Sequence, residues 1–288
     1  MRIQRVSSKW AKTQAILHNS SLSSYIPDTR KYEIHTLKEM LILYETVYIK
    51  PDRGTYGSGV MRAEQRTVTL SPSVPEEGVE DNNERNDKET KLMYILRYGK
   101  SADVFSSPEE LDAALMKVIQ DRPYLIQKGI NLLRHRDRPF DLRVLAQKNP
   151  EGLWETTGML GRVAAPQKIV TNYHNGGRIR SVKALLKKHM DAAETALTIN
   201  QLQTLGIRMG RQLETAYPGI KEIGLDVAID DHHDLWLLEI NTLPSIVVFK
   251  LFPDKSIYRK IHRYAAAYGR VRTANSPLQR KGKSKSSG

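Results

Sequence analysis

The stretch GLDVAIDDHHDLWLLEIN, residues 224–241, says most about how this chain folds. Its two apolar runs, 224–229 and 235–240, have the composition of strands, and the polar run 230–234 between them is typical of a turn. The pattern predicts a β-hairpin whose strands pair antiparallel.

The second strand of this hairpin changes from apolar to polar at its end. Because side chains alternate along a strand, we expect one face to carry Leu235, Leu237, Glu239 and Asn241, and the other to carry Trp236, Leu238 and Ile240. Asp226 interrupts the first strand, and antiparallel pairing would bring it close to Glu239 and Asn241. Two carboxylates and an amide are hard oxygen ligands that suit Mg²⁺.

A second interpretation of these polar residues needs no metal. The strand end would simply have reached solvent, where polar side chains are hydrated. The turn also holds His232 and His233. We expect these two histidines to be solvated turn residues and not metal ligands.

Length and composition restrict the class of protein. With 288 residues, 40% of them apolar and 27% charged, the chain can form a sizeable core in one two-lobed domain or two small ones. It contains no cysteine, which excludes disulfides, thiolate metal sites and cysteine nucleophiles. No apolar run approaches the roughly 18–20 residues of a membrane span, and the N-terminus lacks the apolar segment of a signal peptide. We therefore expect a soluble, cytoplasmic protein with no membrane partner.

The positive charge is concentrated at the C-terminal end. Residues 250–288 hold eleven basic residues and one acid, a formal charge of +10, which leaves +3 of the total +13 for residues 1–249. The nearly neutral body argues against nucleic acid as the main partner. The last stretch, 275–288, is expected to be a disordered, solubilising basic tail. The alternative is an electrostatic dock for a polyanion, including nucleic acid.

Strand and helix signals follow one another in groups and do not alternate regularly, which predicts an α+β fold. The predicted helices cover residues 9–18, 37–44, 107–120 and 199–217. Besides the hairpin, the predicted strands cover residues 46–50, 124–127, 139–146 and 154–157. Residues 71–90, with seven acids and two basic residues, are predicted to form an exposed loop.

A glycine-rich turn, Pro51-Asp-Arg-Gly-Thr-Tyr-Gly-Ser-Gly-Val60, follows Lys50 at the end of a predicted strand. It lacks the lysine of a P-loop and the spacing of a dinucleotide fingerprint. What remains is a flexible hairpin whose backbone N–H groups could cover phosphates. The alternative is an ordinary turn.

Two further segments could bind anions. Asp141 and Arg143 share one face of a predicted strand, where the arginine could hold a phosphate or carboxylate bidentately. The alternative is a surface ion pair worth about 0–1 kcal/mol. The loop 171–177, with Asn172, Gly176 and Gly177, could offer backbone amides to an anion, or be an ordinary loop.

The order of these segments resembles the ATP-grasp superfamily of ADP-forming carboxylate–amine ligases, and more narrowly its endospore coat-associated, YheC/YheD-type branch. The resemblance covers about residues 9–250 and rests on KWAKTQAIL, YIPDTR, VYIKPDRGTYGSGV, YLIQKGINLL, RPFDLRV, TNYHNGGRI and GLDVAIDDHHDLWLLEINTLPS. It implies two α+β lobes that grip ATP between antiparallel sheets. We expect an N-terminal helix and linker (1–36), a small lobe with the glycine-rich flap (37–126), a large lobe with the Mg²⁺ site (127–270) and a disordered basic tail (271–288).

The resemblance also implies roles for individual residues. Lys50 would contact the α- and β-phosphates, with Lys9 as a second, earlier lysine. The flap over the triphosphate would contain Gly54, Gly57, Ser58 and Gly59, and the hinge that holds adenine would contain Gln127, Lys128 and Ile130. Arg143 would meet the γ-phosphate or an acyl phosphate, and Asn172, Gly176 and Gly177 would line the phosphate and acceptor side. Two Mg²⁺ ions would be held by Asp226, Glu239 and Asn241.

The implied function is an ATP- and Mg²⁺-dependent ligase of a carboxylate and an amine that acts through an acyl phosphate, in a sporulation setting. Many relatives carry a full domain ahead of the Lys9 helix, where this sequence has eight residues, so we expect an open acceptor side that suits a peptide or protein substrate. Gln127 and Lys128 stand where many relatives carry acids, which leaves the ribose contact unassigned. The alternatives are a phosphotransferase with the same fold and a nucleotide-binding spore-coat protein without turnover.

Overall fold

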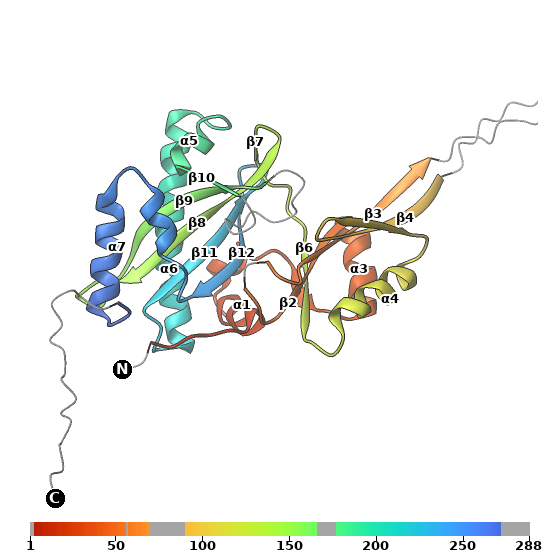
Figure 1. Cartoon of the computed structure of the whole chain (residues 1–288), viewed down its shortest axis with the longest axis horizontal. Coiled ribbons are helices and arrows are strands. Elements are labelled where there is room, and N and C mark those ends of the chain that lie inside the picture. The colour runs from red at the N-terminus through yellow and green to blue at the C-terminus, as the bar shows by residue number, and fades with distance from the viewer. Residues whose placement is uncertain (1–2, 56, 70–89, 166–176, 272–288) are drawn as a thin grey trace, which may run out of the picture.

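The computed structural model describes residues 3–55, 57–69, 90–165 and 177–271, and its strands form two antiparallel sheets, one in each lobe (Figure 1). The first sheet has the order β1-β6-β2-β3-β4-β5. Its strands are β1 (Thr29–Lys31), β2 (Thr46–Pro51), β3 (Met61–Thr69), β4 (Thr90–Tyr98), β5 (Ser101–Phe105) and β6 (Tyr124–Lys128).

The second sheet has the order β10-β9-β8-β11-β12, and a short strand, β7, also pairs with β8. Its strands are β7 (Arg134–His135), β8 (Arg138–Lys148), β9 (Trp154–Val163), β10 (Arg178–Arg180), β11 (Glu222–Ile229) and β12 (Leu235–Thr242). The predicted hairpin is confirmed as β11 and β12. The predicted α+β class is confirmed too, because the strand pairs of the described residues are all antiparallel and helices pack on the sheets.

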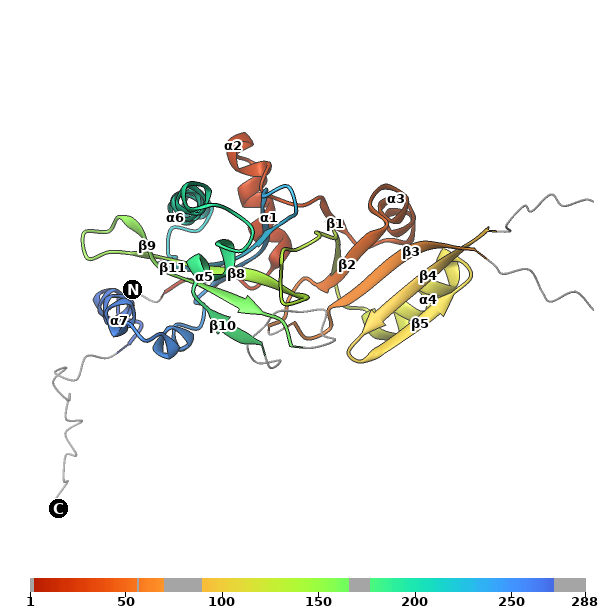
Figure 2. The ribbon, with the colours of Figure 1, turned by 90° about the horizontal axis from the view of Figure 1, so that it is seen from above.

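In the small lobe, α3 (Ile34–Tyr44) and α4 (Pro108–Ile119) pack on one face of the first sheet. The start of α4 is as predicted: the Ser107 hydroxyl accepts a hydrogen bond from the Glu110 N–H at 3.2 Å, and Pro108 opens the helix. Leu37, Met40, Leu111 and Leu115 are fully buried between helices and sheet. In Figure 2 the strands β4 and β5 lie in front of α4, with no described helix over them.

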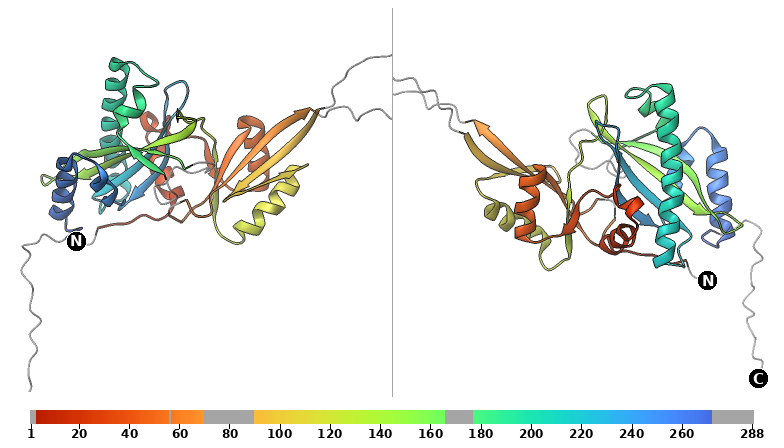
Figure 3. Two further views of the ribbon diagram at one scale, coloured as in Figure 1. Left: turned by 45° about the horizontal axis from the view of Figure 1, so that its top comes forward. Right: turned by 180° about the vertical axis from the view of Figure 1, so that it is seen from behind.

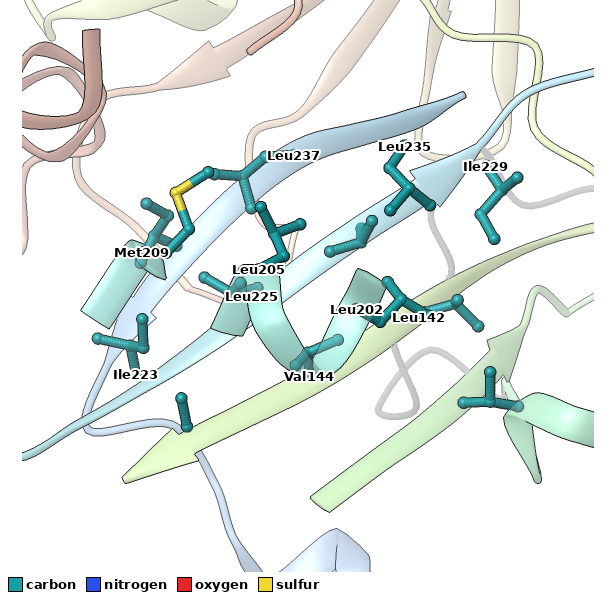
Figure 4. Close-up of a cluster of buried hydrophobic side chains, with 14 of the residues drawn as sticks. Leu142, Val144, Leu202, Leu205, Met209, Ile223, Leu225, Ile229, Leu235 and Leu237 are labelled. Carbon is teal, nitrogen blue, oxygen red and sulfur yellow. The ribbon is translucent and has the colours of Figure 1, made fainter. Parts of the chain in front are cut away.

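In the large lobe, helices cover both faces of the second sheet. The long helix α6 (Ala192–Ala216) packs on one face, where Leu202 and Leu205 meet Leu142 and Val144 of β8 (Figure 4). The 3₁₀ helix η2 (Val247–Leu251) and α7 (Lys255–Ala267) pack on the other face through Phe249 and Ile261. Figure 2 shows α6 and α7 on opposite sides of β8 and β9. The other helices of this lobe are α2 (Ser20–Ser23) and α5 (Val182–Leu186).

Helix α1 (Lys9–Leu17) lies between the two lobes (Figure 3). Its buried Ala15 and Ile16 belong to the core of the large lobe. Its first turn is tied to the small lobe, because the Asp52 carboxylate accepts hydrogen bonds from the Ser8 hydroxyl at 2.9 Å and the Trp10 N–H at 2.8 Å. The start of α1 is therefore fixed beside the glycine-rich turn.

Several predicted boundaries were wrong. The strand predicted at 154–157 runs on to Val163, and α6 begins at Ala192 where the sequence predicted 199, because Asp191 and Glu194 form a capping box. The hairpin predicted at the glycine-rich turn, with an extended segment after it, is present as β2 and β3, but the sequence did not predict β4 and β5. Of the loop predicted at 71–90, only Thr90 is described, and it begins β4; of the predicted tail, residues 272–288 lie outside the described residues.

Candidate functional site

A cleft between the two lobes collects most of the predicted site residues. It contains about 830 Å³ of empty space, with the open solvent at its mouth included. Its lining includes ten of the predicted residues: Lys9, Lys50, Gly54, Gly57, Ser58, Gln127, Lys128, Ile130, Asp226 and Glu239. Arg143 and Asn241 line an adjoining cavity instead.

The predicted faces of β12 were wrong, because the strand contains a β-bulge. Val227 pairs with Leu237, but the next residue, Asp226, pairs with Glu239, so Leu238 is an extra residue. The alternation therefore shifts by one. Glu239 and Asn241 lie on the same face as Asp226, as required for a shared site, whereas Leu235, Leu237 and Ile240 are together in the hydrophobic core.

Asp226 lies in a buried cluster of two aspartates and two arginines. Its Oδ1 accepts from Arg143 Nε at 2.6 Å and lies 3.1 Å from Arg162 Nη2. Arg162 also binds both oxygens of Asp141, at 2.8 and 2.5 Å. Burial acts to raise the pKa of Asp226, but the charges and hydrogen bonds of the two arginines outweigh it and hold the pKa below 3.8. The carboxylate therefore stays charged inside the fold.

This cluster corrects the interpretation of Asp141 and Arg143. They do share a face of β8, but they do not form the surface ion pair that was the alternative, because each pairs with a neighbouring strand. Arg162, the residue directly opposite Asp141, was missed. The sequence did contain a signal for it, a lone arginine in the apolar stretch Met159-Leu-Gly-Arg-Val163. The predicted strand ended at residue 157 and did not include this stretch.

Three lysines surround Glu239. Lys9 Nζ lies 3.7 Å from Glu239 Oε1, and burial lowers the pKa of both Lys12 and Lys50 to about 8, against the opposing attraction of Glu239. Lys12 is 4% exposed and was missed by sequence reasoning. Its signal was the spacing of three residues from Lys9, which places both lysines on one side of α1. One carboxylate among three cations leaves this end of the cleft electropositive.

The side chain of Gln127 is turned toward Lys50 and holds it. Gln127 Oε1 accepts a hydrogen bond from Lys50 Nζ at 2.5 Å, and Gln127 Nε2 donates to Thr29 Oγ1 at 2.9 Å. Lys128 Nζ lies between two aromatic rings, 5.2 Å from the centre of Tyr44 and 5.0 Å from that of Trp236.

The glycine-rich turn is tied to α1 through Lys9, whose Nζ donates to Pro51 O at 3.0 Å and Gly54 O at 3.3 Å. Gly57 and Gly59 both have φ of +74°, in the region that favours glycine. A Cβ at Gly59 would come within 2.8 Å of Tyr124 Oη, so this turn packs tightly on β6. Gly59 does not line the cleft itself, although its neighbour Ser58 does.

The adjoining cavity is also lined by Asp226 and Glu239 and contains about 880 Å³ of empty space, open solvent included. It shares Thr55, Arg162, Asp226 and Glu239 with the cleft, and adds Arg5, Arg143, Asn241 and Ser245 among its lining residues. The two spaces thus meet at the predicted metal ligands, and arginines line the second one.

The donor set of Asp226, Glu239 and Asn241 fits a hard cation. Asp226 Oδ1 is occupied by the two arginines, but among the described residues its Oδ2 has only a 3.5 Å contact with Asn241 Nδ2. Carboxylate and amide oxygens therefore remain on one face of the sheet, next to the electropositive end of the cleft.

Two other predicted groups are not among the described lining residues of this cleft. The turn Asp230–Asp234 is exposed at His232 and His233, and the Asp230 carboxylate is taken up by the backbone N–H groups of His232 and Asp234 and by Trp236 Nε1. Asp230, Asp231 and His232 have potential ligand atoms within 4.8 Å of one another. The hydrogen bonds of Asp230 within the turn account for this clustering without a metal ion. Asn172 and Gly176 lie outside the described residues, and Gly177 is buried just before β10.

A sequence model of the YheC/D-like ATP-grasp family matches residues 3–271. The endospore coat-associated protein YheD of Bacillus subtilis (strain 168) is 25% identical over 248 residues, which are 84% of this chain and 49% of YheD. The endospore coat-associated protein YheC of the same strain is 22% identical over 240 residues, 82% of this chain and 60% of YheC. The chain thus spans about half to three fifths of the length of these curated relatives.

Among solved structures, D-alanyl-alanine synthetase A from Vibrio cholerae O1 biovar eltor strain N16961 is 12% identical, with a TM-score of 0.47. The alignment covers 89% of this chain and 60% of that one. Within the described parts of the chain, no helix has the length and apolar character needed to cross a membrane.

Proposed function

The chain belongs to the YheC/D-like ATP-grasp family, and on that basis we propose that it is an ATP- and Mg²⁺-dependent ligase that joins a carboxylate to an amine. The observation that carries the proposal is the meeting of two cavities at Asp226 and Glu239, with lysines on the cleft side and arginines on the other. One cavity would hold ATP and the other its carboxylate partner. The carboxylate would thereby face the end of the triphosphate.

In this proposal the cleft binds ATP through its cations and its hinge. The backbone around Lys128 and Ile130 would hold adenine, and Lys9 and Lys50 would attract the phosphates. Gln127 would be a positioning residue, because its amide oxygen accepts a hydrogen bond from Lys50 and is therefore not free to bind the nucleotide. Gly57 and Ser58 would cover the phosphates from above.

Asp226, Glu239 and Asn241 would hold Mg²⁺, which supplies charge neutralisation to the phosphates when bound. The chain's own residues would orient the flap and the γ-phosphate. Lys9 fixes the flap by donating to Pro51 O and Gly54 O. Arg143 is held against Asp226 at the junction of the two cavities, where it can meet the γ-phosphate.

The proposed reaction needs no protein nucleophile. A carboxylate oxygen of the substrate attacks the γ-phosphorus of ATP, a new P–O bond forms, and ADP leaves. The amine nitrogen of the second substrate then attacks the carbonyl carbon of the acyl phosphate, inorganic phosphate leaves, and the nitrogen loses a proton to give the amide. Positioning and charge neutralisation provide most of the acceleration in such a transfer. The curated relatives are called endospore coat-associated, and we propose the same setting for the substrate.

Trapping of the acyl phosphate with hydroxylamine tests this function. Purified protein is incubated with ATP, Mg²⁺ and hydroxylamine, and amino acids and short peptides are screened for carboxylate-dependent ADP and hydroxamate formation. Asp226→Asn should abolish both products, whereas Asp231→Asn, in the exposed hairpin turn, should leave them unchanged. ADP with a stable phosphorylated product and no hydroxamate would indicate a phosphotransferase. Nucleotide binding without ADP release for any carboxylate would indicate a non-catalytic protein.

A further inference from the structure

The open face of the small-lobe sheet carries Tyr48 and Lys50 at the cleft, but its far part, on β3, β4 and β5, is not used by the proposed function. Residues alternate along β3 and β4, and the set that includes Met61, Ala63, Tyr94 and Leu96 faces the helices. The opposite set forms what we name the arginine face, which consists of Arg62, Glu64 and Arg66 of β3, Ile95 and Arg97 of β4, and Val104 of β5. In Figure 2, β4 and β5 of this face are seen with α4 behind them.

Three arginines on this face converge on one glutamate. Glu64 is 4% exposed, and its carboxylate lies 2.9 Å from Arg66 Nη2, 3.1 Å from Arg97 Nε and 3.4 Å from Arg62 Nε. The arginine side chains remain 29% to 50% exposed. One carboxylate offsets one of the three charges, so the face carries two formal positive charges in excess.

The arrangement is more than is needed to neutralise Glu64. Arg62 and Arg97 are direct partners in the β3–β4 register, and like charges at such positions repel. Arg62 Nε is buried and makes no hydrogen bond within the described chain. The hydrogen bonds to Glu64 use Nε and Nη2 of Arg66 and Nε of Arg97, and the buried Arg62 Nε cannot reach a ligand. Among the described residues, the other guanidinium N–H groups are left for a ligand with several carboxylates.

The apolar residues of the face indicate what kind of anion it fits. Ile95 pairs with both Glu64 and Val104, so aliphatic side chains stand beside the arginines, and Val104 is 58% exposed. Among the described residues, the aromatic ring nearest in register is Tyr48, opposite Arg62, and it lines the cleft. Single-stranded nucleic acids are usually held by rows of stacked aromatic rings, which this face lacks in its described part.

We propose that the arginine face binds an extended acidic polypeptide, with carboxylates on Arg62, Arg66 and Arg97 and aliphatic side chains on Ile95 and Val104. Because Tyr48 joins this face to the cleft, a bound peptide would run toward the site where the carboxylate reacts. The claim that this peptide is the carboxylate substrate rests on the proposed function. The claim that the face binds an acidic peptide does not rest on it, because peptide binding is measured without ATP.

The probe is a fluorescein-labelled peptide of alternating glutamate and valine, followed by fluorescence anisotropy. We expect binding that weakens with added salt, and no comparable binding of a glutamine–valine peptide of the same length. The triple variant R62Q/R66Q/R97Q should bind at least about tenfold more weakly. A matched triple variant of exposed arginines on the large lobe, R136Q/R211Q/R259Q, should bind as the unmodified protein does.

The variant E64Q separates a binding face from a merely structural ion cluster. It frees the three arginines, so we expect about threefold tighter peptide binding even where stability falls. Unchanged or weaker binding by E64Q would overturn the proposal, and so would equal binding by the two triple variants. Tighter binding of a single-stranded oligonucleotide of equal charge would assign the face to nucleic acid instead. If the triple variant does not fold, the proposal is tested with E64Q and with the single variant R66Q, which changes the most exposed of the three arginines. R66Q should then bind the peptide more weakly, and E64Q more tightly, than the unmodified protein.

Discussion

Arg143 and Asp226 are direct partners across β8 and β11, with Arg143 Nε 2.6 Å from Asp226 Oδ1. This pair, with Arg162 on its other side, fixes a charged carboxylate at the junction of the two cavities. Because Oδ1 is occupied, only Oδ2 is left to face Asn241. The arginines therefore define which edge of the carboxylate a cation could use.

Removal of Arg162 should be strongly destabilising. Its guanidinium contacts Asp141 and Asp226, all three side chains are buried, and Arg162→Met would leave two buried carboxylates with Arg143 alone. We expect a loss of about 3–5 kcal/mol in the free energy of unfolding, measured by urea denaturation. Arg178→Met, at an exposed position of β10, is the control and should change it by less than about 0.5 kcal/mol. A small effect of Arg162→Met would show that the cluster is not stabilising as described.

Nucleotide affinity should fall as pH rises through 8. Burial lowers the pKa of Lys50 to about 8 in the empty cleft, so at pH 9 most of its amine is neutral and must take up a proton to meet a phosphate. We expect the affinity for ADP to fall about tenfold between pH 7 and pH 9. Lys50→Arg stays charged and should flatten this dependence. The measurement is calorimetric titration at fixed Mg²⁺, and equal slopes for both proteins would refute the assignment.

Lys12→Met should stabilise the empty protein at pH 7. The pKa of Lys12 is lowered by burial from 10.5 to about 8, so below pH 8 the fold contains a buried charge that the unfolded chain holds in water. Between pH 8 and 10.5 the unfolded state binds more protons, so the stability of the unmodified protein rises with pH there. We expect a gain of about 1–3 kcal/mol at pH 7 that shrinks toward pH 10.

Urea denaturation at several pH values measures this effect, with Lys117→Met on the exposed side of α4 as the control. The control should show neither the gain nor its pH dependence. A Lys12→Met protein that is less stable at pH 7 would mean that the attraction of Glu239 for Lys12 outweighs the cost of burying its charge.

A methyl group at Gly59 should impair nucleotide binding. Gly59 has φ of +74°, and its added Cβ would meet Tyr124 Oη at 2.8 Å, so either the flap or the tyrosine side chain must shift. Gly152 has a similar φ of +81° but open space around a Cβ, so Gly152→Ala carries the backbone strain alone, about 1 kcal/mol. We expect about tenfold weaker ADP binding for Gly59→Ala and unchanged binding for Gly152→Ala. The same affinity in both variants would mean that the flap does not cover the nucleotide.

Residue pattern alone predicted the elements whose signals are local. The hairpin of β11 and β12, the start of α4 at Ser107, and the shared face of Asp141 and Arg143 all follow from alternation or capping, and all are present. The family resemblance, which the family model confirms, predicted which segments meet at the cleft. Roles of individual residues within the cleft stay predictions.

What the sequence did not show depends on contacts between distant segments. The bulge at Leu238 exists because β12 must pair with β11 on both sides of it, and a two-residue period cannot reveal such a shift. Arg162 and Lys12 are polar residues in apolar surroundings, and their partners, Asp141 and Glu239, lie on other elements. The orientation of Gln127 toward Lys50 likewise appears only when β2 and β6 pair.

The most direct test of the account is thermal unfolding with ADP or a non-hydrolysable ATP analogue, with and without Mg²⁺, for the unmodified protein and Glu239→Gln. Nucleotide at a hundred times its dissociation constant should stabilise the fold by about 2.7 kcal/mol. We predict a stabilisation that depends on Mg²⁺ and is lost in Glu239→Gln but kept in the hairpin-turn variant Asp231→Asn. If neither nucleotide stabilises the fold at any soluble concentration, the account is contradicted. The chain would then have the family fold without a nucleotide-binding cleft.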